Sequence, residues 1–405
     1  MKVLFLSSTS SGVTSKGIYS DLMLYFAQQN HDVTIVYNST KSEPLVDPAY
    51  LHENIRFVPS VSANLTKNKN LIKKGIATIL FDTTFKNTMK RELKDEQFDL
   101  VLYATPPVNF VKSLKYLKKK NPNALFYLML KDIFPQNAVD INIMRKNGLI
   151  YSYFKRQERH LYELSNVIGT MSPANYDYFN KNNPQYKGVV EILPNTTTLT
   201  SENTVTLTRE ELKLPEDMKL LFYGGNLGYP QSVPFILECF EKIKSRDDIG
   251  MVIVGSGGQD HLITEYIEMN KPQNFFYFKF QPHDKYLSIM RNCDIGLIFL
   301  DYRFTIPNYP QRVLGYMTEK LPVICVTDPS SDIGQIAEEN KYGYFVPSND
   351  SSAWIDCVDS LVDDENKMQE MGENAYQFLQ NNYLSHHAYE IILDAYDTFD
   401  KKENS

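Results

Sequence analysis

Glycines and hydroxyl side chains gather in two loops of the sequence, and each loop could hold an anion. The first loop spans residues 7–17, SSTSSGVTSKG, and the second spans 224–231, GGNLGYPQ. Glycines let the backbone approach a ligand closely, and the helix that follows each loop offers unpaired N–H groups to a phosphate. These loops therefore favour the binding of a phosphorylated ligand. For the first loop, a plain turn between strand and helix explains the residues equally well.

A carboxylate follows a third apolar stretch. Residues 124–130 are apolar, and the polar loop KDIFPQN at 131–137 comes directly after them. A carboxylate at such a place could accept a proton in catalysis or could cap the next helix. Asp132 therefore has two interpretations, one chemical and one structural.

The elements that must position these loops alternate along the whole chain. Short apolar, β-branched runs are followed by segments with helical spacing of apolar residues, which is typical of parallel sheets buried on both faces. Loops that leave the carboxyl edge of such a sheet are where ligands bind. The sequence predicts an α/β protein with two doubly wound, Rossmann-like domains. The expected strands lie near 2–6, 33–36, 99–103, 124–130, 167–170, 219–223, 251–254, 275–280, 294–300 and 322–326.

The expected domain boundary lies near residue 195, where a stretch rich in hydroxyl side chains, 196–208, has little apolar periodicity. Two similar halves suit two domains of similar size. We assign residues 1–195 to an N-terminal domain, 196–382 to a C-terminal domain and 383–405 to a final helix.

The segment 304–347 resembles a known signature. Its residues PQRVLGYMTEKLPVICV are similar to the nucleotide-sugar-binding run of retaining family-4 glycosyltransferases, whose two Rossmann-like domains face a cleft (the GT-B type). The resemblance is strongest to bacterial enzymes that build capsule and surface polysaccharides. One departure matters, because that family carries two glutamates where this chain has Pro307 and Gly315. A carboxylate at position 315 therefore cannot bind the ribose here.

The resemblance implies a hexosyltransferase that takes a sugar from a nucleoside diphosphate donor, UDP-linked in the expected case, with retention and without a metal or other cofactor. Negative charge develops on the departing diphosphate, and Arg312 suits it because a guanidinium pairs with two phosphate oxygens. The alternative for Arg312 is a solvent-facing helix residue. Asn308 and Asp332 are the candidates for contacts to sugar hydroxyls, and Asp332 is also expected to cap a helix. The full predicted donor set is Gly225, Asn226, Gln231, Gln281, Asn308, Arg312 and Asp332.

On the acceptor side, the resemblance implies a saccharide, carried on a lipid in the expected case. Asp132 becomes the candidate base or orienting carboxylate, and the final helix is expected to cross back to the N-terminal domain. The residues predicted for the acceptor and phosphate loops are Gly12, Lys16, Gly17, Lys131 and Asn137.

Two other functions stay open on the sequence. A catalytically silent nucleotide-sugar-binding protein would explain the missing glutamate at 315, and a nucleotide-sugar epimerase of similar architecture would turn over without an acceptor.

Composition and charge limit the partners and the location. The chain has 42% hydrophobic and 22% charged residues and a net charge of −7, which is ordinary for a globular protein. No nucleic-acid-binding motif is present, and no apolar run reaches the length of a membrane span. We expect a cytoplasmic protein. The four cysteines, at 239, 293, 325 and 357, lack metal-type spacing and are expected to be buried free thiols.

Basic residues are concentrated within 66–94, in a net-basic N-terminal half. Apolar residues lie between them, which is the composition of a helix on an anionic membrane surface. We therefore expect peripheral association with the inner face of the cell membrane. A packed surface helix with solvated lysines is the alternative. The basic residues are Lys67, Lys69, Lys73, Lys74, Lys86, Lys90, Arg91 and Lys94.

Overall fold

The computed structural model describes all residues except 11, 40–45, 62–70, 200–205 and 404–405, and it describes only the backbone of 71–80 and of 403. The chain forms two compact units. Unit 1 comprises Met1–Thr198 and Leu384–Ser405, and unit 2 comprises Leu199–Tyr383.

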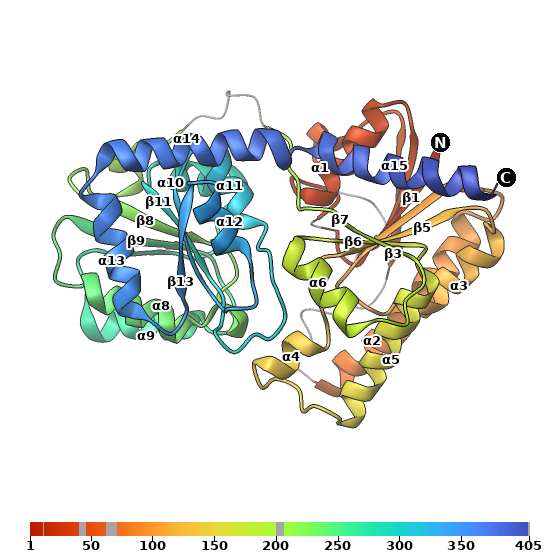
Figure 1. Cartoon of the computed structure of the whole chain (residues 1–405), viewed down its shortest axis with the longest axis horizontal. Coiled ribbons are helices and arrows are strands. Elements are labelled where there is room, and N and C mark those ends of the chain that lie inside the picture. Colours follow the sequence, from red (N-terminus) through yellow and green to blue (C-terminus); the bar gives the residue numbers. More distant parts are fainter. Residues whose placement is uncertain (11, 40–45, 62–70, 200–205, 404–405) are drawn as a thin grey trace. The chain divides into compact units, whose positions relative to one another are not determined.

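Unit 1 is built on a seven-stranded sheet with helices on both faces (Figure 1). All its described strand pairs are parallel, and the order is β3-β2-β1-β4-β5-β6-β7. The direction of strand order reverses between β1 and β4, as in a doubly wound fold. The strands are β1 (Lys2–Ser7), β2 (Asp32–Ser39), β3 (Ile55–Val61), β4 (Leu100–Ala104), β5 (Leu125–Leu130), β6 (Val167–Thr170) and β7 (Val189–Ile192). The helices are α1 (Ile18–Gln28), α2 (Leu71–Glu92), α3 (Val111–Lys120), α4 (Gln136–Asp140), α5 (Leu149–Leu164), α6 (Pro173–Asn182) and α15 (Ser385–Glu403).

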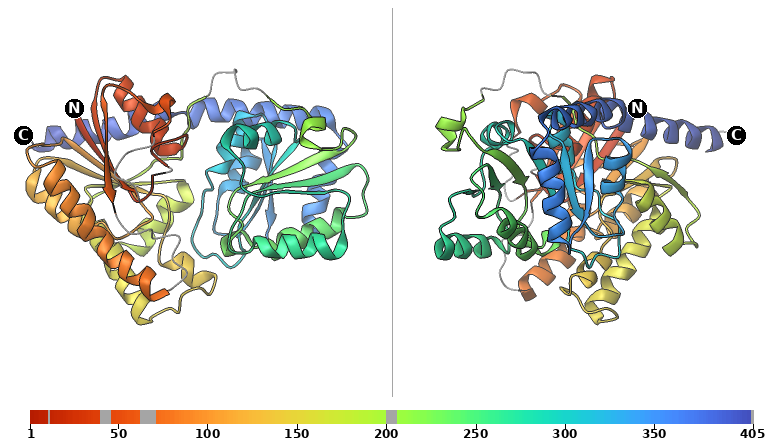
Figure 2. Two further views of the ribbon diagram at one scale, coloured as in Figure 1. Left: turned by 180° about the vertical axis from the view of Figure 1, so that it is seen from behind. Right: turned by 60° about the vertical axis from the view of Figure 1, so that its left-hand side comes forward.

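Continuous apolar strands are required because both faces of this sheet are buried. On β1, Val3 and Phe5 belong to one core cluster and Leu4 and Leu6 to another, as the two-residue period of a strand dictates. The helix α15 covers the first of these faces. Its Ile392 lies in the same cluster as Val3, and Figure 2 shows α15 (dark blue) beside the sheet of unit 1.

Unit 2 contains a six-stranded sheet of the same design, with the order β10-β9-β8-β11-β12-β13. Its described strand pairs are also parallel, and the reversal lies between β8 and β11. The prediction of two doubly wound α/β domains is thus confirmed. The strands are β8 (Lys219–Gly224), β9 (Ile249–Val254), β10 (Phe275–Phe278), β11 (Ile295–Phe299), β12 (Val323–Thr327) and β13 (Gly343–Pro347). The helices are α7 (Arg209–Leu212), α8 (Val233–Ile243), α9 (Asp260–Asn270), α10 (His283–Arg291), α11 (Arg312–Thr318), α12 (Ile333–Glu339), α13 (Ser351–Val362) and α14 (Glu365–Asn382).

Two helix starts differ from the sequence-based expectation. The helix expected from Pro310 begins at Arg312, although Val313 N–H already donates to the carbonyl of Pro310. Asp332 does precede α12, but its side chain makes no capping hydrogen bond. Its backbone is already helical, with φ of −92° and ψ of −1°, whereas a capping residue needs an extended backbone. The prediction that Asp332 caps a helix is therefore wrong.

The helix expected on a membrane is only partly described. Residues 66–70 and the side chains of 71–80 lie outside the described part, including the side chains of Lys73 and Lys74. From position 81 onward the apolar side of α2 faces inward, because Phe81, Phe85 and Met89 are buried in a core cluster. None of the helices in the described part of the chain has both the length and the apolar character of a membrane span.

The cysteines are free thiols, as expected, but their burial differs. Three of them, Cys239, Cys293 and Cys325, are buried, whereas Cys357 is half-buried. The expectation of burial is therefore wrong for Cys357, because its helix α13 turns that position partly towards solvent.

Candidate functional site

The glycine loop of unit 2 leaves β8 at the point where the strand order reverses. Gly225 has a φ of 139°, which favours glycine, and its N–H donates to Val254 O at 2.9 Å. The next loop presses against it, since a Cβ on Gly255 would lie 1.8 Å from Gly225 O. Backbone conformation therefore requires glycine at 225, and close packing requires glycine at 255.

Asn226 and Gln231 shape the same loop from within. Gln231 Oε1 accepts hydrogen bonds from Asn226 Nδ2 at 3.0 Å and from Gly228 N at 3.1 Å. Gln231 is buried and Asn226 is exposed. The structure thus brings these two predicted residues together, with Gln231 holding the loop and Asn226 at its surface.

Arg312 lies against this glycine loop. Its guanidinium carbon is 4.6 Å from the centre of the Tyr223 ring, and a Cβ on Gly225 would be 3.1 Å from the guanidinium. Its Nη1 atom is buried and has no hydrogen-bond partner, and no carboxylate of the described residues forms an ion pair with it. A buried N–H donor without an acceptor is costly. An anion bound at the loop would satisfy it.

Two tyrosines that the sequence analysis did not assign surround this arginine. Tyr316 Oη donates to Leu297 O at 3.0 Å and accepts from Gly224 N at 3.2 Å, which fixes α11 to two strands. Burial raises the pKa of Tyr286 to about 12, and the nearby Arg312 charge opposes the rise. Tyr316 lies in the PQRVLGYM run and could have been singled out there, but Tyr286 has no local signal.

A hydrogen-bonded network occupies the loops after β11 and β12. Asn308 N donates to Ser331 Oγ at 2.9 Å, and Ser331 Oγ donates to Asp328 Oδ2 at 2.9 Å. Burial raises the pKa of Asp328 to about 6, although the hydrogen bonds from Ser331 and Ser330 limit the rise. Asp328 was not predicted. Its position two residues after the apolar run 322–326 was the available signal.

The remaining predicted donor residues, Gln281 and Asp332, lie on other elements than Arg312. Gln281 is half-buried between β10 and α10, where its Nε2 donates to Lys279 O at 3.1 Å. Asp332 is half-buried at the start of α12. Gly315 leaves room for a side chain, because a Cβ there would meet only Met290 at 3.5 Å.

In unit 1, Asp132 follows β5 at the carboxyl edge of the sheet. Asn137 Nδ2 donates to its two carboxylate oxygens at 2.8 and 2.9 Å. Burial raises the pKa of Asp132 to about 6, and the hydrogen bonds from Ile133 N–H and Asn137 limit the rise. The structural interpretation of Asp132 as a helix cap is wrong, since Pro135 is the N-cap of α4.

The neighbour Lys131 is anchored in the other direction. Its Nζ donates to Leu193 O at 2.9 Å and to Pro194 O at 3.1 Å, and burial lowers its pKa to about 7. Tyr19 also lies near Asp132. Burial raises the pKa of the Tyr19 hydroxyl, and the nearby Asp132 charge raises it further. Tyr19 was missed, having only a helical apolar spacing in the sequence.

The loop after β1 binds inward as well. Lys16 Nζ pairs with the buried Asp21 Oδ2 at 3.0 Å and donates to Thr198 O at 2.7 Å. Gly17 precedes α1 with an extended backbone, and its carbonyl accepts from Asp21 N. Gly12 lies beside the Tyr19 ring, because a Cβ added to Gly12 would be 3.4 Å from that ring. Of the three predicted residues in this loop, Gly12 is the one that contacts Tyr19, the neighbour of Asp132.

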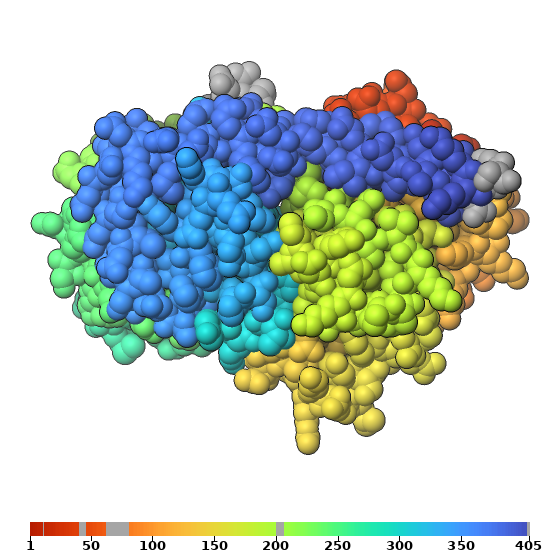
Figure 3. Space-filling model, viewed as in Figure 1, coloured from red at the N-terminus to blue at the C-terminus, as the bar shows by residue number. Residues whose placement is uncertain are grey.

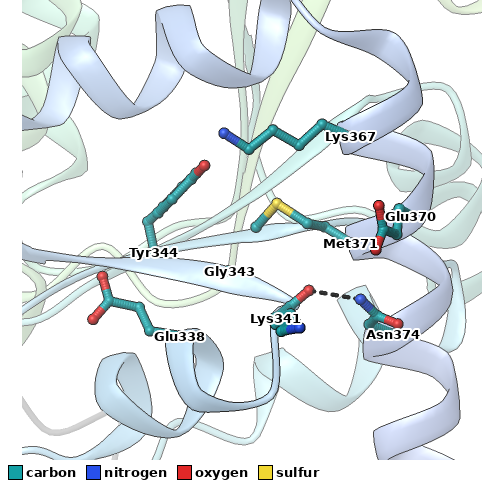
Figure 4. Close-up of a pocket in the computed structure, with 8 residues that line it drawn as sticks. All are labelled: Glu338, Lys341, Gly343, Tyr344, Lys367, Glu370, Met371 and Asn374. Carbon is teal, nitrogen blue, oxygen red and sulfur yellow. Dashed lines mark hydrogen bonds between the residues drawn. The ribbon is translucent and has the colours of Figure 1, made fainter.

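A separate pocket of about 410 Å³ in unit 2 contains none of the predicted residues (Figure 4). It lies where α12 ends and β13 begins, beside α14, at the amino edge of the sheet. Its lysine Lys367 already donates to Ser360 Oγ at 2.7 Å and lies over the Tyr344 ring. Asn374 Nδ2 donates to Lys341 O at 3.0 Å. The loops after β8 and β11, which carry predicted donor residues, belong to the opposite edge.

Comparison with known proteins finds similarity to glycosyltransferases. Residues 205–378 match the family model described as glycosyl transferases group 1. The chain is 21% identical over 359 residues to the probable glycosyltransferase WbjE of Pseudomonas aeruginosa, covering 87% of this chain and 86% of the relative. It is 21% identical over 130 residues to the putative colanic acid biosynthesis glycosyl transferase WcaI of Escherichia coli K12, covering 32% of each.

A solved structure shares the fold. Anabaena HepE in complex with UDP-glucose aligns with a TM-score of 0.64 at 13% identity, covering 98% of this chain and 100% of that one. Residues 205–378 are therefore a glycosyl transferases group 1 domain, and the chain that carries them is a glycosyltransferase.

Proposed function

We propose that unit 2 binds a nucleoside diphosphate sugar, UDP-linked, and that the enzyme transfers its sugar to a saccharide acceptor. The observation that carries this proposal is the buried Arg312 Nη1 without a partner, beside the Gly225 backbone. Anabaena HepE, which shares the fold, has been solved with UDP-glucose, and this supports the choice of donor.

The donor chemistry follows from the charge that develops. As the glycosidic bond to the diphosphate breaks, negative charge accumulates on the leaving phosphate. A preorganised guanidinium stabilises that charge more than it stabilises the ground state. Arg312 is preorganised because it is stacked on Tyr223, so little conformational entropy is lost on binding. Asn308 and Asp332 are retained as the contacts to sugar hydroxyls.

On the acceptor side, we propose Asp132 as the base or orienting carboxylate. With a pKa of about 6 it is mostly ionised at neutral pH, yet basic enough to accept a proton from a sugar hydroxyl. The double hydrogen bond from Asn137 fixes the carboxylate in one orientation. Retention of configuration and independence from metal are proposed on the family resemblance.

We further propose a role in capsule or exopolysaccharide synthesis with a lipid-linked acceptor, at the inner face of the membrane. The relative WcaI is named for colanic acid biosynthesis, which supports a polysaccharide product. The basic residues at 66–94 support contact with an anionic surface. For the described part of this segment after position 80, the alternative of a packed helix is favoured, because its apolar side chains are buried in a core cluster.

A panel of nucleotide sugars tests the proposal. We expect UDP-sugars to raise the melting temperature and, with a saccharide acceptor present, to release UDP. Stabilisation without UDP release under any acceptor would indicate a silent binding protein. Conversion of the donor sugar without an acceptor would indicate an epimerase. No stabilisation by any nucleotide sugar would contradict the proposed donor site.

A further inference from the structure

One end of unit 1 exposes apolar side chains that ordinary folding would bury. The exposed fractions are 92% for Leu149, 65% for Ile150, 57% for Ile143 and 37% for Tyr153. We call residues 141–156 the α4–α5 tip. Figure 3 shows this segment, in yellow, protruding from unit 1, and Figures 1 and 2 show α4 and the start of α5 at that end.

The grouping distinguishes this tip from the scattered exposed apolar residues of any protein. The fully buried residues of α5 are Glu158, Leu161 and Tyr162, all in its second half. No residue in the first two turns of α5 is fully buried, although Phe154 packs against the core cluster and the Phe134 ring. The sequence of these turns, LIYSYF, is nevertheless apolar and aromatic.

The tip has a defined backbone. The N–H groups of Ile143 and Met144 both donate to Ala138 O at 2.9 Å, and Gly148 N donates to Arg145 O at 3.2 Å. Asn142 and Asn147 adopt left-handed conformations, with φ of 60° and 63°, that turn the chain back into α5. The apolar side chains are thus presented by a folded turn.

The charged side chains within residues 141–157 have a single sign. Every charged residue from 141 to 157 is basic and exposed, namely Arg145, Lys146, Lys155 and Arg156. Lys155 pairs with the buried Glu158, whereas the other three form no ion pair with any described residue. Exposed apolar side chains flanked by unpaired cations complement a surface that is anionic outside and apolar beneath.

We propose that the α4–α5 tip docks on an anionic lipid bilayer, with Leu149 and Ile150 entering the acyl region and the basic side chains contacting headgroup phosphates. The inference deepens the proposed function, and rests on it in one respect, because it names the surface through which a lipid-carried acceptor is met. It also places the apolar contact on α5 and not on the described part of α2, where Phe81 and Phe85 are buried.

Fluorescence of a single introduced tryptophan tests insertion directly. The chain has one tryptophan, Trp354, which is buried in unit 2 and gives a constant background. Leu149→Trp should be quenched by brominated lipids in vesicles of phosphatidylglycerol and phosphatidylcholine. The matched control is Leu51→Trp, at a position of unit 1 that is 60% exposed, which should not be quenched. Equal quenching of the two variants, or none in either, would overturn the proposal.

Sedimentation with vesicles gives the second measurement. We expect Leu149→Ser with Ile150→Ser to weaken binding about tenfold or more, and Arg145→Ser with Lys146→Ser to reduce its salt dependence. Leu51→Ser should bind as the parent does. Unchanged vesicle binding in the Leu149/Ile150 variant would contradict the proposal, and so would a loss of self-association in place of vesicle binding. UDP affinity should be intact in every variant, so a failure at the tip leaves the donor proposal untouched.

Discussion

The carboxyl edges of the two sheets are built alike but end in opposite electrostatic states. In unit 1 the charged groups already have partners, since Lys16 pairs with Asp21 and Asp132 accepts from Asn137. In unit 2, Arg312 holds a buried N–H donor with no acceptor. Two sheets of the same design thus carry different groups at their carboxyl edges. The edge of unit 1 carries a hydrogen-bonded carboxylate, and the edge of unit 2 carries an N–H donor without an acceptor.

This difference supports the proposed assignment of acceptor chemistry to unit 1 and of donor binding to unit 2. A carboxylate held by neutral donors keeps a pKa suited to proton transfer, whereas a guanidinium stacked on an aromatic ring keeps its charge for phosphate. Fold alone does not separate the two edges, because both follow the rule that ligands bind where the strand order reverses. Their side-chain partners do.

The largest expected effect comes from Asp132→Asn, which keeps the shape and removes the basicity. Turnover should fall about 100-fold or more if Asp132 accepts the proton, with donor affinity unchanged. Steady-state kinetics with excess donor measures it. The control is Asp140→Asn, on the neighbouring α4, which should be nearly normal. Near-normal turnover of Asp132→Asn would remove the carboxylate from the chemistry.

Arg312→Ala should weaken UDP binding by about 1.5–3 kcal/mol, the usual contribution of hydrogen bonds to a charged group. The control is Arg246→Ala, whose guanidinium is already paired with Asp248 and Asp359 before β9, at the amino edge of the sheet. Its UDP affinity should match that of the parent. If both variants bind UDP as tightly as the parent, the anion-binding edge is misplaced.

The pH profile should show the unit 1 carboxylate titrating. In the proposed mechanism Asp132 acts in its ionised form, and its pKa is raised to about 6, so kcat/KM should fall about tenfold per pH unit below that value. Lys131 titrates nearby, with a pKa lowered to about 7, and its contribution is retained in Asp132→Asn. The difference between the two profiles therefore isolates Asp132. Identical acid limbs in both proteins would assign the titration elsewhere.

The smallest functional effect is expected from Lys16→Ala. This change removes the ion pair of the buried Asp21, which keeps its hydrogen bonds from Tyr50, Thr197 and Thr198. The free energy of unfolding should therefore fall by about 1.5–3 kcal/mol. Turnover and UDP affinity should stay within twofold of the parent. Urea unfolding and calorimetry separate the outcomes, and a loss of turnover at unchanged stability would show that Lys16 contacts a substrate.

The sequence predicted the fold because the strands are apolar on both faces, as the alternation of Val3 and Leu4 between two cores shows. It also indicated the loops at Gly225 and Asp132, since chain order places them after strands. Contacts between residues that are distant in sequence could not be predicted. The Lys16 to Thr198 hydrogen bond spans 182 positions, and nothing local marks it.

Backbone conformation and burial limited the rest. Asp332 has the residue type of a cap, but its helical backbone prevents capping. Asp328 follows β12 like many turn residues, and only its burial against Ser331 reveals a raised pKa. The unpaired Nη1 atom of Arg312 likewise depends on which side chains surround it, which a single sequence does not specify.

A comparison of UDP with UMP on two proteins tests the central claim, that Arg312 binds the donor diphosphate. Calorimetric titration of the parent and of Arg312→Ala with both nucleotides gives four affinities, and these form a double-mutant cycle. We predict that removing the β-phosphate weakens binding to the parent at least about tenfold more than it weakens binding to Arg312→Ala. An equal loss of affinity in the two proteins would contradict the claim.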